Sequence, residues 1–319
     1  MSPVPVTFRR LPLLHLSGEA CVDTARDVAV RDVVGVRELI STALPLEPSA
    51  PPAPPLSPYP CVDVLGVRVS AIDLDRLLAD IGDALDGRRR LRVTFANPNY
   101  LVAAHDDAGL RERINAFDHV LSDGHGVMLA ARMLGRRIPR RLANDDIVEP
   151  LFAELARREA RVFLLGSAPG VAAAAADRVT ASFPGLRIAG HTYGYRTPGE
   201  GLDRQYTPAA FERMRAEIAR AKPDFLVVSI PTPYQQRFVV DYLDGLDVPV
   251  VMTGGAWIDH LAERLQYYPS WVVRLGLCWA YRWVQEPRRL TNRYTVELAD
   301  FGRRVLRQRR ARRAADQGH

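Results

Sequence analysis

The residues of this sequence that could do chemistry gather where apolar runs end. Asp123 follows the run HVLS and stands before Gly124 and Gly126. A carboxylate there, with open backbone around it, is placed as a general base would be. An aspartate in a plain glycine turn accounts for the same residues equally well. Asn97 ends the preceding run ahead of Pro98 and could hydrogen-bond a sugar or a uracil ring, although Asn-Pro is also common in turns.

Two groups of arginines could bind an anion. In the segment RRLANDD, Arg141 could bind a diphosphate and Asp146 a sugar hydroxyl, because charged groups make strong hydrogen bonds to such partners. Ion pairing at the surface is the simpler explanation. Arg282, Arg289 and Arg293 fall near one face of a predicted helix, within reach of one phosphate. A solvated helix face accounts for the same spacing.

Two turns between predicted strands and helices carry weaker signals. In VFLLGSAPGVAAAAADRV the turn would direct backbone N–H groups at a phosphate, but the G-x-G-x-x-G spacing of dinucleotide sites is missing. In IPTPYQQRF the prolines suit the first turn of a helix and leave Gln235 and Gln236 unexplained. Asp73 and Asp75 have the D-x-D spacing of some metal sites. A helix N-cap at Asp73 accounts for that spacing, and we expect no metal site.

Strands must position these residues. Short apolar runs, separated by helix-like stretches, predict strands over 92–97, 118–123, 161–166, 186–190, 224–230 and 248–254. Strands that alternate with helices predict an α/β fold, in which a mostly parallel sheet has helices on both faces. Ligands of such sheets bind beyond the carboxyl ends of the strands, where Asn97 and Asp123 lie.

The sequence divides into three parts. Residues 1–60 are predicted to be a leader and linker, because LPLEPSAPPAPPLSPYP is too rich in proline for a helix or a central strand. Residues 61–268 form the sheet domain, which opens with a short strand pair and an amphipathic helix. Residues 269–319 form a basic helical appendage. Its apolar stripe, which we expect to pack on the protein body rather than enter lipid, consists of Trp271, Leu275, Trp279 and Trp283.

Composition favours a globular, enzyme-sized protein. The chain has 319 residues, of which 47% are hydrophobic and 25% charged, enough for one good-sized core. The net charge of +6 is concentrated in the segment FGRRVLRQRRARR, which suits anionic lipid head groups, diphosphates or nucleic acid. We find no signal-peptide core and no run of about 18 apolar residues, so we expect a cytoplasmic protein that does not span a membrane. The three cysteines lie far apart and show no zinc-ligand spacing.

Taken in order, seven segments resemble the WecG/TagA/CpsF glycosyltransferases, bacterial enzymes that add N-acetylmannosamine or related sugars during teichoic acid, common antigen and exopolysaccharide synthesis. The resemblance covers roughly residues 62–295. Its landmarks are ANPNYLVAA, DDAGLRERINAFDHVLSDGHGV, RRLANDD, FLLGSAPG, PDFLVVSIPTPYQQ, TGGAWID and PSWVVRLGLCWAYRWVQEPRR. No single segment is decisive, but their order and spacing argue against chance.

This resemblance implies a Rossmann-like sheet on which an inverting, metal-independent transfer takes place without a cofactor. The implied donor is a UDP-sugar and the implied acceptor a sugar carried on a polyprenyl diphosphate. An enzyme with such an acceptor would work at an anionic membrane surface, so we expect peripheral association with the inner face of the plasma membrane. Nucleic acid is not an expected partner, and the sequence leaves open whether the chain forms a homo-oligomer.

The resemblance also implies roles for individual residues. Asp123 matches the aspartate proposed as the base, and Arg141 matches an arginine that steadies the leaving diphosphate. Asn97 and Gln235 match an active-site asparagine and a motif glutamine. Arg141 and Asp146 are the first and last residues of the family's R-x-x-G-x-D pattern. The arginines that would close over the site from the appendage are Arg282, Arg289 and Arg293.

Several positions depart from the family pattern. Phe95 stands where the family usually has threonine, and Thr94 beside it could take that place in substrate binding. Asn144 replaces a glycine, and Tyr234 and Gln236 replace a lysine and a glutamate. These changes leave the base and the phosphate arginine in place and affect what the donor site would select.

Two other classes of function compete with this reading. Alternating strands and helices also build NAD(P)-binding oxidoreductases, but the missing G-x-G-x-x-G spacing counts against one here. The basic C-terminus alone would also suit a nonenzymatic protein that binds membranes or nucleic acid.

Overall fold

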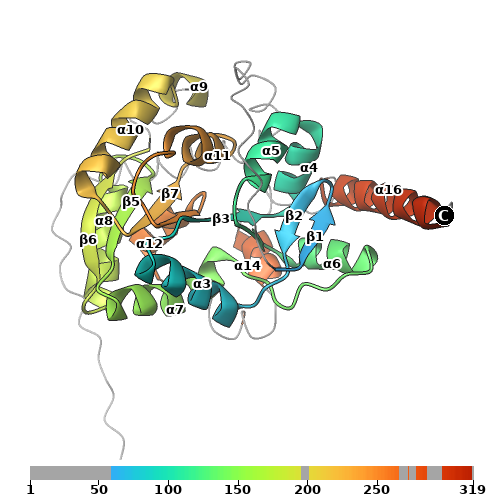
Figure 1. The fold of residues 1–319 in the computed structure, drawn as a ribbon, viewed down its shortest axis with the longest axis horizontal. Coiled ribbons are helices and arrows are strands. Elements are labelled where there is room, and N and C mark those ends of the chain that lie inside the picture. The colour runs from blue at the N-terminus through green and yellow to red at the C-terminus, as the bar shows by residue number, and fades with distance from the viewer. Residues whose placement is uncertain (1–58, 195–200, 266–271, 273–277, 286–296, 318–319) are drawn as a thin grey trace, which may run out of the picture.

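A six-stranded parallel sheet forms the centre of the computed structural model, which describes residues 59–194, 201–265, 272, 278–285 and 297–317 (Figure 1). The strands lie side by side in the order β4-β3-β8-β7-β5-β6. Each neighbouring pair in that order runs parallel. In chain order they are β3 (Leu91–Ala96), β4 (His119–Ser122), β5 (Arg161–Gly166), β6 (Arg187–Thr192), β7 (Phe225–Ser229) and β8 (Val250–Thr253).

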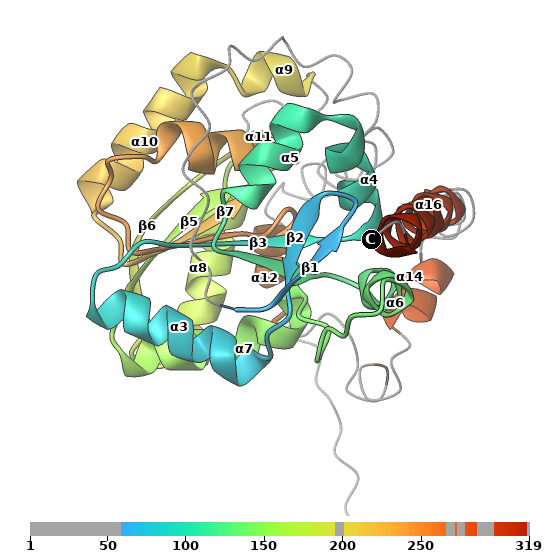
Figure 2. The ribbon, with the colours of Figure 1, turned by 45° about the vertical axis from the view of Figure 1, so that its right-hand side comes forward.

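Helices cover both faces of the sheet, and each face has its own apolar core (Figure 2). Alternate residues of a strand point to opposite faces, so Val93 of β3 lies in one core and Ala96 in the other. One face carries α4 (Pro98–Asp106), α5 (Ala108–Asn115), α10 (Pro208–Ala221), α11 (Tyr234–Arg237) and the π-helical turn η1 (Phe238–Tyr242). The other carries α3 (Leu74–Asp86), α7 (Asn144–Arg157), α8 (Val171–Ser182) and α12 (Trp257–Glu263).

A separate antiparallel hairpin packs beside β4. It consists of β1 (Cys61–Val64) and β2 (Val67–Ser70), which pair from Cys61↔Ser70 to Val64↔Val67. Leu65 and Gly66 form the two-residue turn with φ of +55° and +87°. Positive φ at both turn residues matches the twist of antiparallel strands, which accounts for the tight connection.

The C-terminal helices lie against the sheet domain near β4. Helix α16 (Leu298–Gln317) contacts α4 and α6 (His125–Met133), and it buries Phe301 and Val305 in the core (Figure 2). Helix α14 (Cys278–Gln285) lies close by. Because residues 286–296 and most of 266–277 are outside the described part of the chain, the predicted division at residue 269 stays a prediction.

The predicted fold class is confirmed. All six predicted strands, the opening strand pair and the helix that follows it are present, and the main sheet has helices on both faces. Asp73 is the N-cap of α3, where its side chain accepts a hydrogen bond from the backbone N–H of Arg76, as expected. Among the described helices, none is long and apolar enough to cross a membrane.

A buried polar cluster joins β4 to α3 and β2. His119 is 2% exposed, its Nε2 lies 3.1 Å from Asp80 Oδ2, and its Nδ1 lies 3.4 Å from Ser70 Oγ. Arg76 Nη2 also donates to Asp80 at 2.7 Å. Burial holds the pKa of His119 below its ordinary value, against the opposing effect of Asp80, so its imidazole is neutral near neutral pH.

This cluster predicts a pH dependence of stability. The His119 pKa is lower in the folded chain than the value of about 6.5 expected when unfolded, so the unfolded chain takes up the proton first as the pH falls. The stabilisation is complete above about pH 6.5 and is lost below it. Between about pH 7.5 and 5.5, the melting temperature of His119→Gln should therefore fall less than that of the wild type.

Thermal unfolding followed by circular dichroism at constant ionic strength measures that difference. His191→Gln, which changes an exposed histidine, is the control and should follow the wild-type curve. Parallel curves for His119→Gln and the wild type would contradict the prediction.

Candidate active site

The connections of the sheet change face between the neighbouring strands β3 and β8. After β3 the chain turns into α4 on one face, and after the neighbouring strand β8 it turns into α12 on the other. Where adjacent parallel strands connect to opposite faces, their carboxyl ends leave a crevice for a ligand. The predicted site residues can therefore be located relative to the carboxyl edge of the sheet, where the strands end.

Asp123 and Asn97 lie next to each other at that edge. β3 and β4 pair in the register Ala96↔Ser122, and the backbone N–H of Asp123 donates to the Ala96 carbonyl at 2.9 Å. Both side chains are partly exposed. Asn97 is the N-cap of α4, where its Oδ1 accepts from the Tyr100 N–H at 3.1 Å. The two residues thus follow the carboxyl ends of paired strands.

Arg141 reaches the same edge from the loop before α7. The N–H of Leu142 donates to the Ser122 carbonyl at 3.0 Å. Leu142 follows Arg141 and Ser122 precedes Asp123, so this bond holds the backbone of Arg141 near that of Asp123. Arg141 Nη2 pairs with Asp146 Oδ1 at 2.8 Å, and their side chains are 15% and 7% exposed. Asp146 Oδ2 also accepts from the N–H of Ala143 at 3.0 Å. The pair is largely buried, and Asp146 holds both Arg141 and the start of α7.

Two amide side chains grip the turn that follows β8. Asn144 Nδ2 donates to the Gly254 carbonyl at 2.9 Å from α7, on one face of the sheet. From α11, on the other face, Gln235 Oε1 accepts from the Gly255 N–H at 3.2 Å. The Ser229 hydroxyl bonds the Gly255 carbonyl, and Gly255 has a φ of +55°. This turn is therefore held from both faces of the sheet.

Thr94 lies beneath the edge. Its side chain is 0% exposed, and its Oγ1 lies 2.7 Å from Thr253 Oγ1 and 3.4 Å from the Tyr100 hydroxyl. Burial raises the pKa of Tyr100, which keeps the hydroxyl protonated as a partner for Thr94. Thr94 therefore supports the strands under the crevice and has no exposed surface for a ligand.

Two further polar groups at this edge were not found from sequence. His125 begins α6, two residues after Asp123, and partial burial followed by the Arg141 guanidinium holds its pKa below the ordinary value. Asp259 of α12 accepts a 2.8 Å hydrogen bond from Ser167, the residue after β5, and burial raises the pKa of its carboxyl. Both stand within six residues of the end of a strand, and reading further past each strand end would have found them.

The appendage arginines are only partly described. Arg282 belongs to α14, and its side chain lies outside the described residues, as do Arg289 and Arg293 entirely. Their convergence on a phosphate stays a prediction. Within the described ranges there is no group of three or more His, Cys, Asp or Glu that could hold a metal ion.

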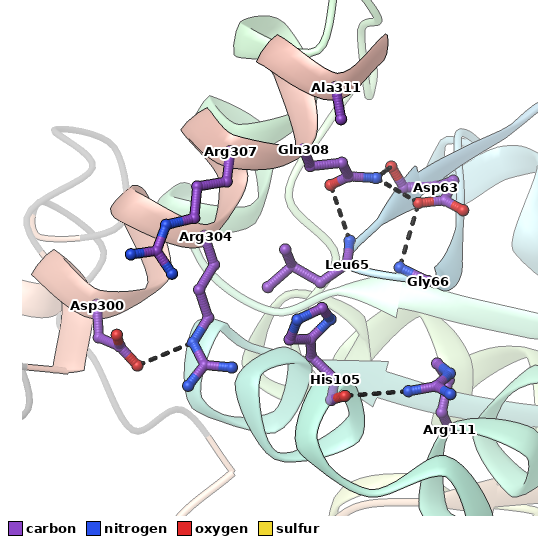
Figure 3. Close-up of a pocket in the computed structure, with 10 residues that line it drawn as sticks. All are labelled: Asp63, Leu65, Gly66, His105, Arg111, Asp300, Arg304, Arg307, Gln308 and Ala311. Atoms are coloured by element: carbon purple, nitrogen blue, oxygen red, sulfur yellow. Dashed lines mark hydrogen bonds and ion pairs between the residues drawn. The ribbon is translucent and has the colours of Figure 1, made fainter. Parts of the chain in front are cut away.

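A groove of about 710 Å³ lies away from this edge, between α16, the hairpin turn and the ends of α4 and α5 (Figure 3). Arg111 donates to the carbonyls of Ala104 and His105 that end α4, and Arg304 pairs with Asp300 at 3.0 Å. These arginines are thus engaged by the protein itself. The groove marks where α16 docks, and its lining includes neither Asp123 nor Asn97.

Comparison with known proteins identifies the family of this chain. Residues 62–315 match the model of the glycosyl transferase WecG/TagA/CpsF family. The chain belongs to this family. It is therefore a glycosyltransferase, which decides against both the oxidoreductase and the nonenzymatic alternative.

Relatives in this glycosyltransferase family share one name, N-acetylglucosaminyldiphosphoundecaprenol N-acetyl-beta-D-mannosaminyltransferase. The protein of Bacillus subtilis (strain 168) is 27% identical over 197 residues, which cover 62% of this chain and 72% of its own. That of Bacillus spizizenii is 27% identical over 228 residues, covering 71% and 83%. That of Staphylococcus aureus (strain MW2) is 23% identical over 231 residues, covering 72% and 86%.

The hydrogen bond from Asn144 to the turn after β8 predicts a stability effect in this glycosyltransferase. Asn144→Ala removes the donor to the Gly254 carbonyl and should lower the free energy of unfolding by about 1–2 kcal/mol, the usual loss when a partly buried carbonyl loses its partner. Urea titration followed by fluorescence measures it. Asp145→Ala, one residue along, removes a 4.0 Å contact with His260 and an acidic side chain in the first turn of α7, and it should cost less, about 0.5 kcal/mol. Equal losses in the two variants would contradict the role given to Asn144.

Proposed function

We propose that this glycosyltransferase moves a sugar from UDP to a sugar carried on a polyprenyl diphosphate, with inversion at the anomeric carbon and Asp123 as the base. The donor sugar would be N-acetylmannosamine or a related residue, N-acetylmannosaminuronic acid, glucose or glucuronic acid. The product would enter exopolysaccharide, teichoic acid or antigen synthesis. The observation that carries the proposal is the placement of Asp123 beside Asn97, with Arg141 held at the same edge.

Inversion requires one direct displacement. The acceptor hydroxyl oxygen bonds to the anomeric carbon as the bond from that carbon to the diphosphate oxygen breaks, and the hydroxyl proton passes to the Asp123 carboxylate. A carboxylate at a strand end is partly exposed and can meet an acceptor there. Asn97 and Asp123 each follow the last paired residues, Ala96 and Ser122, so Asn97 is near enough to the base to orient a sugar hydroxyl.

The departing UDP takes up the negative charge, and arginine would stabilise it. Arg141 is fixed by Asp146 before any ligand arrives, so little reorganisation is needed as charge develops on the diphosphate. Arg282, Arg289 and Arg293 would add further guanidinium groups from the appendage. If these cations neutralise the diphosphate, no metal ion is needed, which is why we expect activity to survive EDTA.

The remaining predicted residues support the donor site indirectly. Gln235 holds the Gly255 N–H and also donates to Thr232 at 3.1 Å, so both ends of its amide are engaged. Thr94 supports β3 from below. We propose that Gln235 and Thr94 shape the crevice around the nucleotide, while Asp259 and His125 lie at its margins.

The acceptor follows from the names of the relatives. Those enzymes are named for N-acetylglucosamine linked through a diphosphate to undecaprenol, a lipid that stays in a membrane. We propose the same acceptor class here and, with it, peripheral association with the inner face of the plasma membrane. The arginine-rich helix α16 supports this proposal, because anionic head groups attract such a segment.

Release of UDP from a panel of UDP-sugars, with a lipid-diphosphate N-acetylglucosamine acceptor and with or without EDTA, tests the proposal. Asp123→Asn should lower kcat by roughly 10²–10⁴, the usual effect of losing a general base, while UDP binding is retained. Asp177→Asn, on the exposed side of α8, is the control and should leave kcat unchanged. Full activity of Asp123→Asn would exclude it as the base.

The appendage is tested separately. A chain that ends at residue 270 should lose transfer, because the appendage arginines would no longer reach the diphosphate, and should bind membranes more weakly, because the arginine-rich α16 is removed. The full-length double variant Arg289→Ala, Arg293→Ala keeps α16 in place and should lower kcat/KM by about 10²-fold or more. Arg220→Ala on α10 is the matched control. Unchanged transfer in both altered chains would remove the appendage from the mechanism.

A further inference from the structure

The exposed apolar side chains of the described residues gather on three neighbouring helices. The large ones are Leu129 (59% exposed) on α6, Trp283 (43%) and Val284 (79%) on α14, and Leu298 (39%) and Leu306 (39%) on α16. Both ribbon views place α6, α14 and α16 side by side (Figures 1 and 2). Clustered exposed apolar groups on one surface mark an interaction site more reliably than scattered ones.

Helix α6 and the loop after it are also strongly basic. No aspartate or glutamate occurs from Gly124 to Asn144. Along the exposed face of α6, His125, Leu129 and Arg132 follow at helical spacing. The exposed arginines of this segment, none of which pairs with an acid in the described part of the chain, are Arg132, Arg136, Arg137 and Arg140.

We propose that residues 125–140, comprising α6 and its basic loop, form a membrane-contacting element that binds an anionic bilayer. Leu129 enters the interfacial region, and the four arginines contact lipid phosphates. The element is distinct from the basic helix α16, although it continues the same surface. The proposal rests on the proposed function, because it gives that function a defined orientation toward its lipid-borne acceptor.

The chemistry of the surface favours a bilayer over a second copy of the chain. Two copies meeting through this face would oppose arginines to arginines, without acids within the segment to compensate. Aliphatic side chains that protrude from a basic helix suit the boundary between head groups and acyl chains. The exposed arginines Arg303 and Arg310 of the adjacent α16 extend the positive charge.

The consequence for the site comes from the position of α6 in the chain. The helix begins at His125, two residues after Asp123, and Leu129 lies four residues further, about 6 Å along the axis. Contact of Leu129 with the bilayer would therefore keep Asp123 within roughly 13 Å of the head groups, from ~6 Å of helix and two preceding residues of about 3.3 Å each. A sugar linked to a membrane-borne diphosphate projects from the surface by a comparable length, so its hydroxyl could reach the base.

Vesicle binding of the full chain tests the proposal. The probe is phosphatidylcholine vesicles with and without phosphatidylglycerol, and cosedimentation measures the bound fraction. We expect Leu129→Gln to weaken binding by roughly tenfold, the usual effect of losing one leucine contact with an apolar phase. Arg136→Glu with Arg137→Glu should weaken binding to the anionic vesicles by more than roughly tenfold and have little effect on pure phosphatidylcholine.

The matched control reverses the same charge elsewhere. Arg89→Glu with Arg220→Glu alters two exposed arginines that lie outside α6, α14 and α16, and it should retain wild-type binding. A short-chain, water-soluble acceptor supplies a second readout, since UDP release with it should be unchanged in Leu129→Gln. Release with acceptor embedded in vesicles should fall together with binding.

The outcomes separate this inference from the proposed function. Wild-type binding of both α6 variants, or equal loss in the control, overturns the membrane contact even if transfer is observed. Loss of binding confined to the α6 variants supports it, and absence of transfer by the wild type would then contradict the glycosyl acceptor alone. A concentration-dependent dimer that the α6 variants abolish, with vesicle binding unchanged, would assign the surface to a second copy and overturn the proposal.

Discussion

The hydrogen bond from the Asp123 N–H to the Ala96 carbonyl is the constraint on which the arrangement of the site depends. It closes the last step of the parallel pairing between β3 and β4, so both strands end at the same level. Asn97 can then cap α4 while Asp123 begins the turn into α6. A shift of one residue in this pairing would turn the side chains of one strand to the opposite core.

The rest of the edge is built by groups that hold backbone rather than ligand. Asp146 steadies Arg141, and Asn144 and Gln235 hold the two peptides after β8 from opposite faces of the sheet. Preorganised groups of this kind keep charged side chains in place without reorganisation during a reaction. The carboxyl edge of the sheet therefore combines partly exposed side chains, such as Asn97 and Asp123, with side chains whose hydrogen bonds hold the backbone and Arg141 in place.

The sequence was sufficient to predict the strands, the α/β class and the position of Asn97 and Asp123 at the carboxyl ends of strands. Those features follow from local patterns, because apolar runs set the strands and parallel strands share one carboxyl edge. The supporting contacts could not be predicted in the same way. Thr94 meets Thr253 across 159 residues, and that partner is known only once β8 is placed between β3 and β7. Asp146 and Gln235 were predicted to bind substrate, which stays a prediction, and the contacts by which they hold Arg141 and the Gly255 turn were not predicted.

The tie between α16 and the hairpin bears on the order in which the chain can fold. Gln308 Oε1 accepts from the Leu65 N–H at 3.0 Å, and the two residues are 243 positions apart (Figure 3). During synthesis the hairpin emerges 243 residues before its partner on α16. The sheet can assemble while that amide is still solvated, and docking of α16 then follows assembly of the sheet. A nascent chain would thus acquire its basic helix only after the reaction edge has formed.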